Sequence, residues 1–483
     1  MSESLNRKVK TATKWATIGE IAAKLVTPIS SVVLARLLTP EAFAVVTTLA
    51  MIISFAEIFT DAGFQKYLVQ HEFIDDKDRD ESTNVAFWSN LAMSLFLWFI
   101  ITAFSGPLAA LVGNPGLGHV LVIACVSIPF AAFSSIQMAL FKRDLDFKTL
   151  AKVRIISTFI PLVITVPLAF WMRSYWALVI GTIIVNLVNA VLLTIYSKWK
   201  PRRFYSLTKL KGMFSFTVWS MVEAISIWLT SYVDVFIVGT MLSQYYLGLY
   251  KTSSTLVGQI MALITSITTP ILFSALSRLQ DNDREFKQLF FKFQKLVGIL
   301  IIPMGAGIYV FSDLITKLLL GNQWLEASGF IGLWGLTGAI TIVFSHYASE
   351  VYRSKGKPRL SVLAQWLHII ALWPAVLIAV KYGFEVLYIV RSLVRFEGIF
   401  VHAIIMLIFI GISFGQMLKN VMPSIIATFI MVLMGIIMKE NMPTNVCWQL
   451  AEIIVCSLIY WGVIIIFKEE RELIKSFILK RSF

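Results

Sequence analysis

Residues 33–70 read VLARLLTPEAFAVVTTLAMIISFAEIFTDAGFQKYLVQ, and this stretch decides the fold. Arg36 closes a first apolar run. Thr39-Pro40-Glu41 then makes a turn, because proline fixes its own φ and disfavours helix in the residue before it. A second apolar run of about 20 residues reaches Asp61-Ala62-Gly63 and is long enough to cross a hydrocarbon core of about 30 Å. The stretch therefore predicts a hairpin of two membrane-spanning helices.

The rest of the chain repeats this pattern. Hydrophobic residues make up 58% of the 483 residues, and the mean hydropathy is +0.78, which is far above the usual composition of a soluble domain. Runs of about 20 apolar residues recur from 13–38 to 447–467. They predict an all-α, polytopic helical membrane protein with about 14 transmembrane helices.

The net charge of +14 has two interpretations, an acidic partner such as nucleic acid or the positive-inside rule. The basic residues cluster in alternate loops such as Lys198–Lys211 and Arg353–Arg359, and at both ends of the chain. In contrast, residues 105–119 contain no Lys or Arg. This alternation favours the positive-inside rule, excludes nucleic acid as the partner, and predicts that both termini lie in the cytoplasm.

The loops between the apolar runs are short. An independent domain needs about 50 residues, so no loop can form a soluble catalytic domain. The chain contains no G-x-x-x-x-G-K-[ST], H-E-x-x-H or G-x-S-x-G motif. Its three cysteines lack CxxC spacing, which argues against a metal site. We therefore expect a protein that is not an enzyme and has no metal.

A weak internal repeat divides the chain. Residues 38–46 match 242–250 at an offset of about 204, and Trp15 then matches Trp219. Each repeat holds six spans, an even number, so both halves have the same orientation and should be related by a pseudo-two-fold axis along the membrane normal. We expect a six-helix lobe over residues 1–200, a second over 201–412, and two extra transmembrane helices with a cytoplasmic tail over 413–483.

Basic side chains inside the spans are the first candidates for a binding site. A charge in mid-bilayer costs about 2.5–3.5 kcal/mol on insertion scales, so those that remain usually face a cavity or a partner. Lys24 follows Glu20 at i, i+4, which fits either a self-neutralised pair or a cavity cation for an anion. Arg391 and Arg395 have the same spacing, and their planar forks suit phosphate, although an inter-helix salt bridge is the alternative.

Acidic side chains inside the spans are candidates for ion coupling. Asp234 could bind a coupling proton or sodium ion, or could neutralise Lys24 or Arg391. Glu57 and Asp61 are also four residues apart. They could serve ion coupling or could pair with basic residues at the cytoplasmic end of their span.

The hairpin at residues 33–70 resembles the start of the polysaccharide-transporter branch of the multidrug/oligosaccharidyl-lipid/polysaccharide flippase superfamily, the Wzx-type O-antigen flippases. The matching residues are the run Leu34–Glu41, Phe43, Asp61, Gly63 and Gln70. The family usually has glycine after the aromatic residue, whereas this chain has Ala44. A twelve-plus-two helix arrangement is also what the resemblance implies.

The resemblance implies a cargo and a mechanism. The cargo would be an undecaprenyl-diphosphate-linked oligosaccharide repeat unit for O-antigen, capsule or exopolysaccharide. It would cross the bacterial cytoplasmic (inner) membrane by alternating access, with Lys24, Arg391 and Arg395 holding the diphosphate. The expected partners are the lipid bilayer, the lipid-linked oligosaccharide, and a polysaccharide polymerase with its chain-length machinery. No cofactor is expected beyond coupling to a proton or sodium gradient.

Two other functions fit parts of the sequence. A cation-coupled multidrug antiporter of the same superfamily should carry acidic groups in the N-terminal lobe, whereas the deep charges of this chain lean basic. An integral-membrane polysaccharide polymerase should have a large extracytoplasmic loop with catalytic groups, and the expected loops are too short for one.

Overall fold

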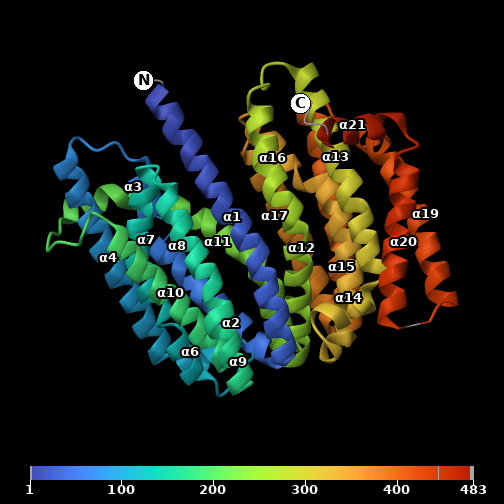
Figure 1. Ribbon diagram of the computed structural model, residues 1–483. Helices are drawn as coiled ribbons and strands as arrows, with labels where there is room; N and C mark the ends of the chain where they lie inside the picture. The colour runs from blue at the N-terminus through green and yellow to red at the C-terminus, as the bar shows by residue number, and fades with distance from the viewer. Residues whose placement is uncertain (1–2, 62, 444, 479–483) are drawn as a thin grey trace. The chain divides into compact units, whose positions relative to one another are not determined.

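A computed structural model describes residues 3–61, 63–443 and 445–478, without the side chains of residues 3–10, 12, 13, 61, 214–220, 222, 223 and 476–478. Over these residues the chain is helical and has no strand (Figure 1). Fourteen helical segments in this part are long and apolar enough to cross a membrane. The prediction of an all-α, polytopic membrane protein with about 14 spans is confirmed.

The helices follow one another with short connections. Their bounds are α1 Glu3–Leu37, α2 Pro40–Asp61, α3 Phe64–Gln70, α4 Asp76–Ala103, α5 Ser105–Leu111, α6 Gly118–Ala124, α7 Ser127–Arg143, α8 Phe147–Ile160, η1 Pro161–Thr165, α9 Val166–Met172, α10 Trp176–Tyr196, α11 Leu207–Met241, α12 Gln244–Ser277, α13 Asp283–Val310, α14 Ser312–Leu319, η2 Asn322–Ala327, α15 Ser328–Thr341, η3 Ile342–His346, α16 Ala348–Ser354, α17 Arg359–Ala379, η4 Val380–Tyr382, α18 Phe384–Ile410, α19 Phe414–Asn441, α20 Val446–Ile464 and α21 Lys468–Ile478.

Local sequence explains where several helices begin. The side chains of Asp75, Ser206 and Asn282 each accept a hydrogen bond from the backbone N–H three residues later, which satisfies a donor that the first turn leaves open. Ser413 does the same and forms a capping box with Gln416. These polar caps start α4, α11, α13 and α19.

The chain divides into two compact units, Met1–Lys251 and Thr252–Phe483, and the boundary falls inside α12. Unit 1 holds α11 together with the six preceding spans. The expected lobe boundaries at residues 200 and 412 remain a prediction, because compactness does not report on an internal repeat.

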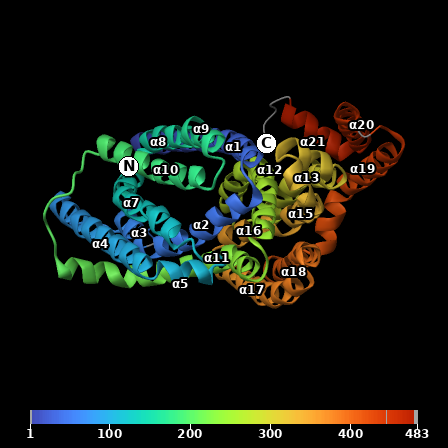
Figure 2. The same cartoon turned by 90° about the horizontal axis from the view of Figure 1, so that it is seen from below.

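Unit 1 is built around α7. This helix packs against α2, α3, α4 and α10, while α8 packs against α1 and α10 (Figure 2). Phe87 and Ile136 lie in one fully buried cluster of this unit, and Leu121 and Ile128 lie in another. The two turns that the repeat relates also meet here: a Cβ atom on Gly248 would collide with the carbonyl of Pro40. Only glycine permits this close approach.

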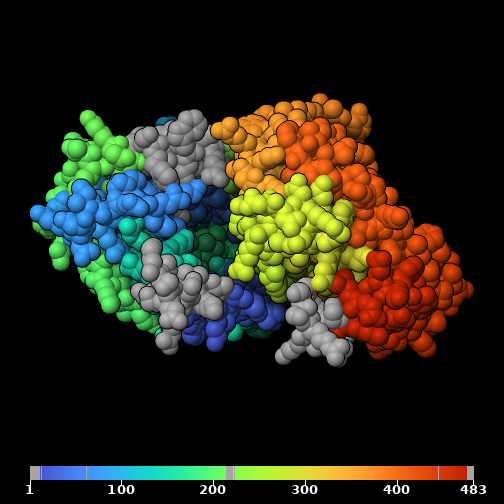
Figure 3. Space-filling view, turned by 90° about the horizontal axis from the view of Figure 1, so that it is seen from above, coloured from blue at the N-terminus to red at the C-terminus, as the bar shows by residue number. Residues whose placement is uncertain are grey.

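Unit 2 is built around α13. This helix packs between α15 and α19, and α19 packs in turn against α20. The red and orange-red atoms of α19, α20 and α21 gather along one side of this unit (Figure 3). The amphipathic α21 is fixed by Leu473, which joins the apolar cluster, and by ion pairs from Lys295 to Glu469 and Glu470.

Candidate functional site

The most unusual charged site lies in unit 2, where two arginines of α18 meet one tryptophan of α15. The guanidinium carbon of Arg395 lies 3.1 Å from the centroid of the Trp334 ring, and that of Arg391 lies 5.0 Å from it. Arg395 Nη1 also donates a hydrogen bond of 3.1 Å to the Trp334 carbonyl. The structure therefore brings together the two arginines that the sequence predicted as a pair.

Packing fixes this arrangement. Trp334 is 6% exposed and Arg391 is 9% exposed. The Trp334 ring lies 5.3 Å from the ring of Phe330, which holds the indole in place. Gly338 lies one turn after Trp334, and a Cβ atom there would approach Arg395 Nη1 to 3.0 Å. The absence of a side chain at Gly338 thus leaves room for the Arg395 guanidinium.

Stacking on an indole has a chemical consequence. The ring attracts the face of a guanidinium through its quadrupole, but it carries no negative charge and does not neutralise the cation. The N–H donors of a guanidinium point outward in its plane, where they match the oxygens of a phosphate. The Trp334 ring therefore holds Arg391 and Arg395 in place without cancelling their positive charge.

A cavity of about 410 Å³ lies beside Arg395. Its lining is mixed, with apolar side chains from α12 and polar groups from α15, η3 and α18. The polar lining includes Thr265, Thr341, Ser345, His346 and His402. A cavity of this size and mixed lining is typical of small-molecule sites, which are commonly about 300–1,000 Å³.

The predicted pair of Lys24 and Glu20 lies in unit 1. Lys24 Nζ is 3.8 Å from Glu20 Oε1, and Arg154 Nη2 of α8 is 2.7 Å from Glu20 Oε2. One carboxylate thus lies between two cations. The ion-pair interpretation of Lys24 describes its contact with Glu20, whereas no sequence pattern pointed to Arg154, which lies on another helix.

Glu20 and Arg154 line a second cavity, of about 710 Å³, between α1, α7, α8 and α10. Hydroxyl groups of Ser30 and Thr158 also line it, and there Ser157 donates a hydrogen bond to Asn189. Lys24 belongs to unit 1 and the two arginines to unit 2. The shared cavity expected for these three residues therefore stays a prediction.

The acidic candidates have separate surroundings. Asp234 is 6% exposed, and it accepts hydrogen bonds from the Tyr250 hydroxyl at 2.7 Å and from the Val235 N–H at 2.8 Å. Glu57 is half-buried on α2. The side chain of Asp61 lies outside the described residues. Ion coupling at Glu20, Asp234, Glu57 or Asp61 remains a prediction.

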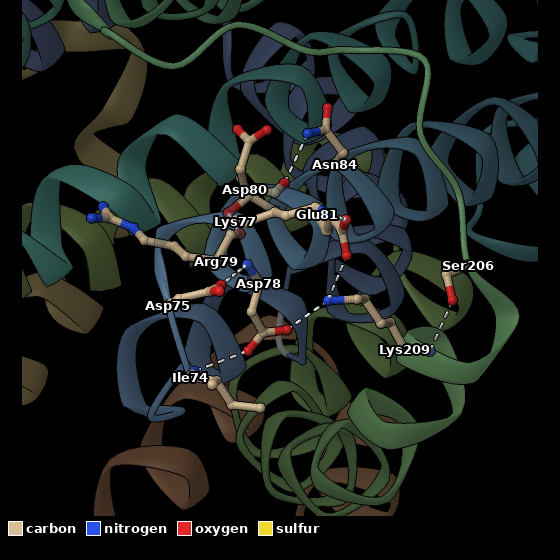
Figure 4. A network of polar contacts seen from close by, with 11 residues as sticks. Ile74, Asp75, Lys77, Asp78, Arg79, Asp80, Glu81, Asn84, Ser206 and Lys209 are labelled. Atoms are coloured by element: carbon tan, nitrogen blue, oxygen red, sulfur yellow. Dashed lines mark hydrogen bonds and ion pairs between the residues drawn. The ribbon is translucent and has the colours of Figure 1, made fainter.

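A further charged cluster joins the basic linker to α4 (Figure 4). Lys209 Nζ lies 2.5 Å from Asp78 Oδ1 and 3.1 Å from Glu81 Oε2. Burial by itself lowers the pKa of Lys209, but the hydrogen bonds that it donates to Asp78 and Glu81 outweigh burial and leave that pKa raised. Arg202 adds a contact of 3.6 Å to Asp80. The sequence indicated the basic linker but not its acidic partner, the first turns of α4.

An all-helical chain with 14 candidate spans and charged side chains held within them belongs to the class of polytopic membrane transport proteins. The particular family follows from comparison with known sequences. The model of the family described as "Polysaccharide biosynthesis protein" matches residues 33–329, and the chain belongs to this family. The match begins at the first residue of the hairpin that decides the fold, and it confirms the resemblance drawn from that hairpin.

Individual relatives and structures agree with the family. The succinoglycan biosynthesis transport protein ExoT of Rhizobium meliloti (strain 1021) is 25% identical over 384 residues, which are 79% of this chain and 76% of the relative. The lipopolysaccharide biosynthesis protein WzxC of Escherichia coli (strain K12) is 22% identical over 66% of this chain and 65% of its own length. The lipid II flippase MurJ, in an inward closed conformation, shares the fold with a TM-score of 0.76 at 14% identity, over 95% of this chain and 99% of that one.

Proposed function

We propose that this chain flips undecaprenyl-diphosphate-linked oligosaccharide repeat units across the cytoplasmic membrane for O-antigen, capsule or exopolysaccharide biosynthesis. The observation that carries the proposal is the pair Arg391 and Arg395, stacked on Trp334 beside a cavity inside the candidate spans. Two cations held by an aromatic ring suit a diphosphate, which offers oxygens to both forks. The glycan crosses with the diphosphate while the lipid tail stays in the bilayer.

The family and the relatives support a transporter. This protein is a membrane transport protein of polysaccharide biosynthesis and not an enzyme, in line with relatives and structural neighbours named as transport proteins and flippases. A multidrug antiporter of the same superfamily is the runner-up. The family model favours the polysaccharide branch, and the pair of stacked arginines suits an anionic cargo better than a cationic drug.

The proposal has a cellular setting. The membrane is the bacterial inner membrane, with both termini in the cytoplasm, where the basic segments lie. The cargo is handed to a polysaccharide polymerase and its chain-length machinery on the far side. Transport is coupled to a proton or sodium gradient, since the chain carries no nucleotide-binding motif. Lys24 contributes to the attraction of the diphosphate in unit 1.

The test compares cation variants in a strain that depends on this chain for surface polysaccharide. The double variant Arg391→Ala/Arg395→Ala should abolish export and leave folded protein in the membrane, and Lys24→Ala should reduce export. Arg359→Ala, at the exposed start of α17, is the matched control and should export normally. Normal surface polysaccharide in the double variant would refute the proposal, whereas lost drug resistance with normal polysaccharide would favour the antiporter.

A further inference from the structure

Unit 2 contains a second titratable site, which lies between the two helices of one hairpin. His368 Nδ1 on α17 lies 3.0 Å from Glu397 Oε2 on α18. His368 is close to the middle of the 21-residue α17, and Glu397 is close to the middle of the 27-residue α18. Both side chains are about three-quarters shielded, at 23% and 27% exposure. A carboxylate and an imidazole thus share a hydrogen bond deep within two candidate spans.

The helix faces show that this pair points away from bulk lipid. The exposed residues of α17 form a stripe that includes Leu363, Ile370 and Leu377. His368 instead lies on the side of Ala364 and Leu372, which are buried. α17 packs against α16, α18 and η4, so His368 belongs to the packed interior of unit 2.

We propose that the His368–Glu397 pair is the site at which this transporter binds its coupling proton. Histidine is the side chain whose charge changes most readily near neutral pH, and a carboxylate at 3.0 Å favours its protonated form. The pair is neutral overall when it holds one shared proton, and it becomes negative when that proton is released to water. An imidazole nitrogen suits a proton, whereas sodium prefers sites made of oxygen atoms alone.

The charged neighbours come from every element that packs against this hairpin. On α16, Glu350 and Arg353 form an ion pair with each other, and the Tyr352 hydroxyl lies 3.1 Å from His402 Nδ1. α15, which is described over its whole length, contributes no titratable side chain. The remaining groups are His346 on η3, Lys381 and Tyr382 on η4, and Glu385, Tyr388, Arg391, Arg395 and His402 on α18.

Two of these neighbours connect the pair to the rest of the mechanism. His402 lines the cavity beside Arg395 and lies five residues after Glu397, about 7.5 Å along α18. It is the nearest titratable group of α18 that faces the cavity on that side, and it can relay a proton between cavity water and the pair. Arg395 lies two residues before Glu397, which is about 200° around a helix.

The position of Arg395 gives a physical route for coupling. One helix, α18, carries the proposed diphosphate site on one face and the His368–Glu397 pair on another. Release of the proton leaves a carboxylate without its cationic partner, and this charge acts on the same helix that holds the two arginines. A shift of α18 in response would change both sites together, which is what coupling between two sites requires.

The inference rests on the proposed function, and the test separates the two. Full-length protein is reconstituted in liposomes that contain pyranine, and the flipping of a fluorescent undecaprenyl diphosphate is followed with and without a pH gradient. For one proton per cycle, a gradient of one pH unit should change the transmembrane ratio of the probe by about tenfold. The dye should report proton movement only when the probe is present.

The variants Glu397→Gln and His368→Gln should still equilibrate the probe across the membrane, but lose both the tenfold response and the proton movement. Glu397→Asp should keep the response with a shifted pH profile, which a merely structural contact would not produce. Glu385→Gln, at the exposed start of α18, and His119→Gln in unit 1 are controls and should behave as wild type.

Each outcome decides one of the two statements. A full response in both Gln variants would overturn the proton site and leave the proposed function standing. A wild-type protein driven by sodium but not by protons would do the same. Failure of the wild type to move the probe at all would overturn the proposed function and the coupling with it.

Discussion

The cations of unit 1 and unit 2 differ in what lies against them. In unit 1, Lys24 and Arg154 share the carboxylate of Glu20, and Lys209 lies between Asp78 and Glu81. In unit 2, Arg391 and Arg395 lie against the ring of Trp334. A carboxylate cancels a positive charge, whereas an indole holds a cation in position without cancelling it.

This difference separates two uses of the same residue types. Paired cations at half-exposed positions, such as Lys24 at 37% and Arg154 at 53%, hold helices together and present little net charge. Cations on an aromatic ring present their charge to whatever enters the neighbouring cavity. We therefore expect the site in unit 2 to dominate the affinity for an anionic headgroup and the site in unit 1 to adjust it.

The largest effect should come from the aromatic platform. Trp334→Leu removes the stacking partner of both arginines and should weaken binding of undecaprenyl diphosphate by about 2- to 30-fold, since each cation–π contact contributes about 0.5–2 kcal/mol. Trp334→Phe keeps a ring and should lose less. Affinity is measured by thermophoresis on purified protein. Equal affinity in the wild type and the Leu variant would break the comparison, because the ring would then not be what presents the charge.

A smaller effect, of opposite sign, is expected in unit 1. Glu20→Gln removes the carboxylate shared by Lys24 and Arg154 and should tighten binding of undecaprenyl diphosphate by about 2- to 5-fold, given that exposed pairs are worth about 0.2–1 kcal/mol. The gain should disappear when Lys24→Ala is added. Glu41→Gln, exposed on α2, is the matched control. A loss of affinity in Glu20→Gln would mean that Glu20 itself contacts the cargo.

The smallest effect should come from the α4 cluster, where Lys209 lies between two carboxylates. Lys209→Met should lower the unfolding free energy by about 0.2–1 kcal/mol for each of the two ion pairs that it removes, and it should leave headgroup affinity unchanged. High salt should reduce the difference from the wild type, because these ion pairs are partly exposed. Thermal unfolding in detergent at low and high salt measures the stability difference, and thermophoresis measures the affinity.

The same cluster has a pH dependence whose sign follows from Lys209. Its pKa is raised in the folded protein, so its contribution to stability is complete below the unfolded value of about 10.4 and is lost as pH rises through the folded value. The wild type and Lys209→Met should therefore converge in stability only in strongly alkaline buffer. Convergence already near neutral pH would show that Lys209 is not stabilised by its carboxylates.

The sequence was most informative where a property is local. The apolar runs predicted 14 spans and the all-α fold, and the turn at Thr39-Pro40 marked the hairpin. Spacing of four residues correctly put Arg391 and Arg395 close enough to share one ring. These predictions succeed because a span depends on summed hydropathy over about 20 residues, and a helix face depends on a fixed 3.6-residue period.

The sequence was least informative about what each charge contacts. Trp334 lies 61 residues before Arg395 in the chain, and Arg154 meets Glu20 across two different helices. Nothing in the acidic first turns of α4 indicated that they bind Lys209 of the linker, and His368 and Glu397 were not recognised as a pair.

The sequence by itself thus determined the class of protein, the number of spans and which residues must carry charge in the membrane. Tertiary structure alone decided whether each charge is cancelled by a carboxylate, held on an aromatic ring or shared with a histidine. The physical reason is range: hydropathy and helix period act along the chain, whereas a charge takes its environment from helices that only folding brings beside it.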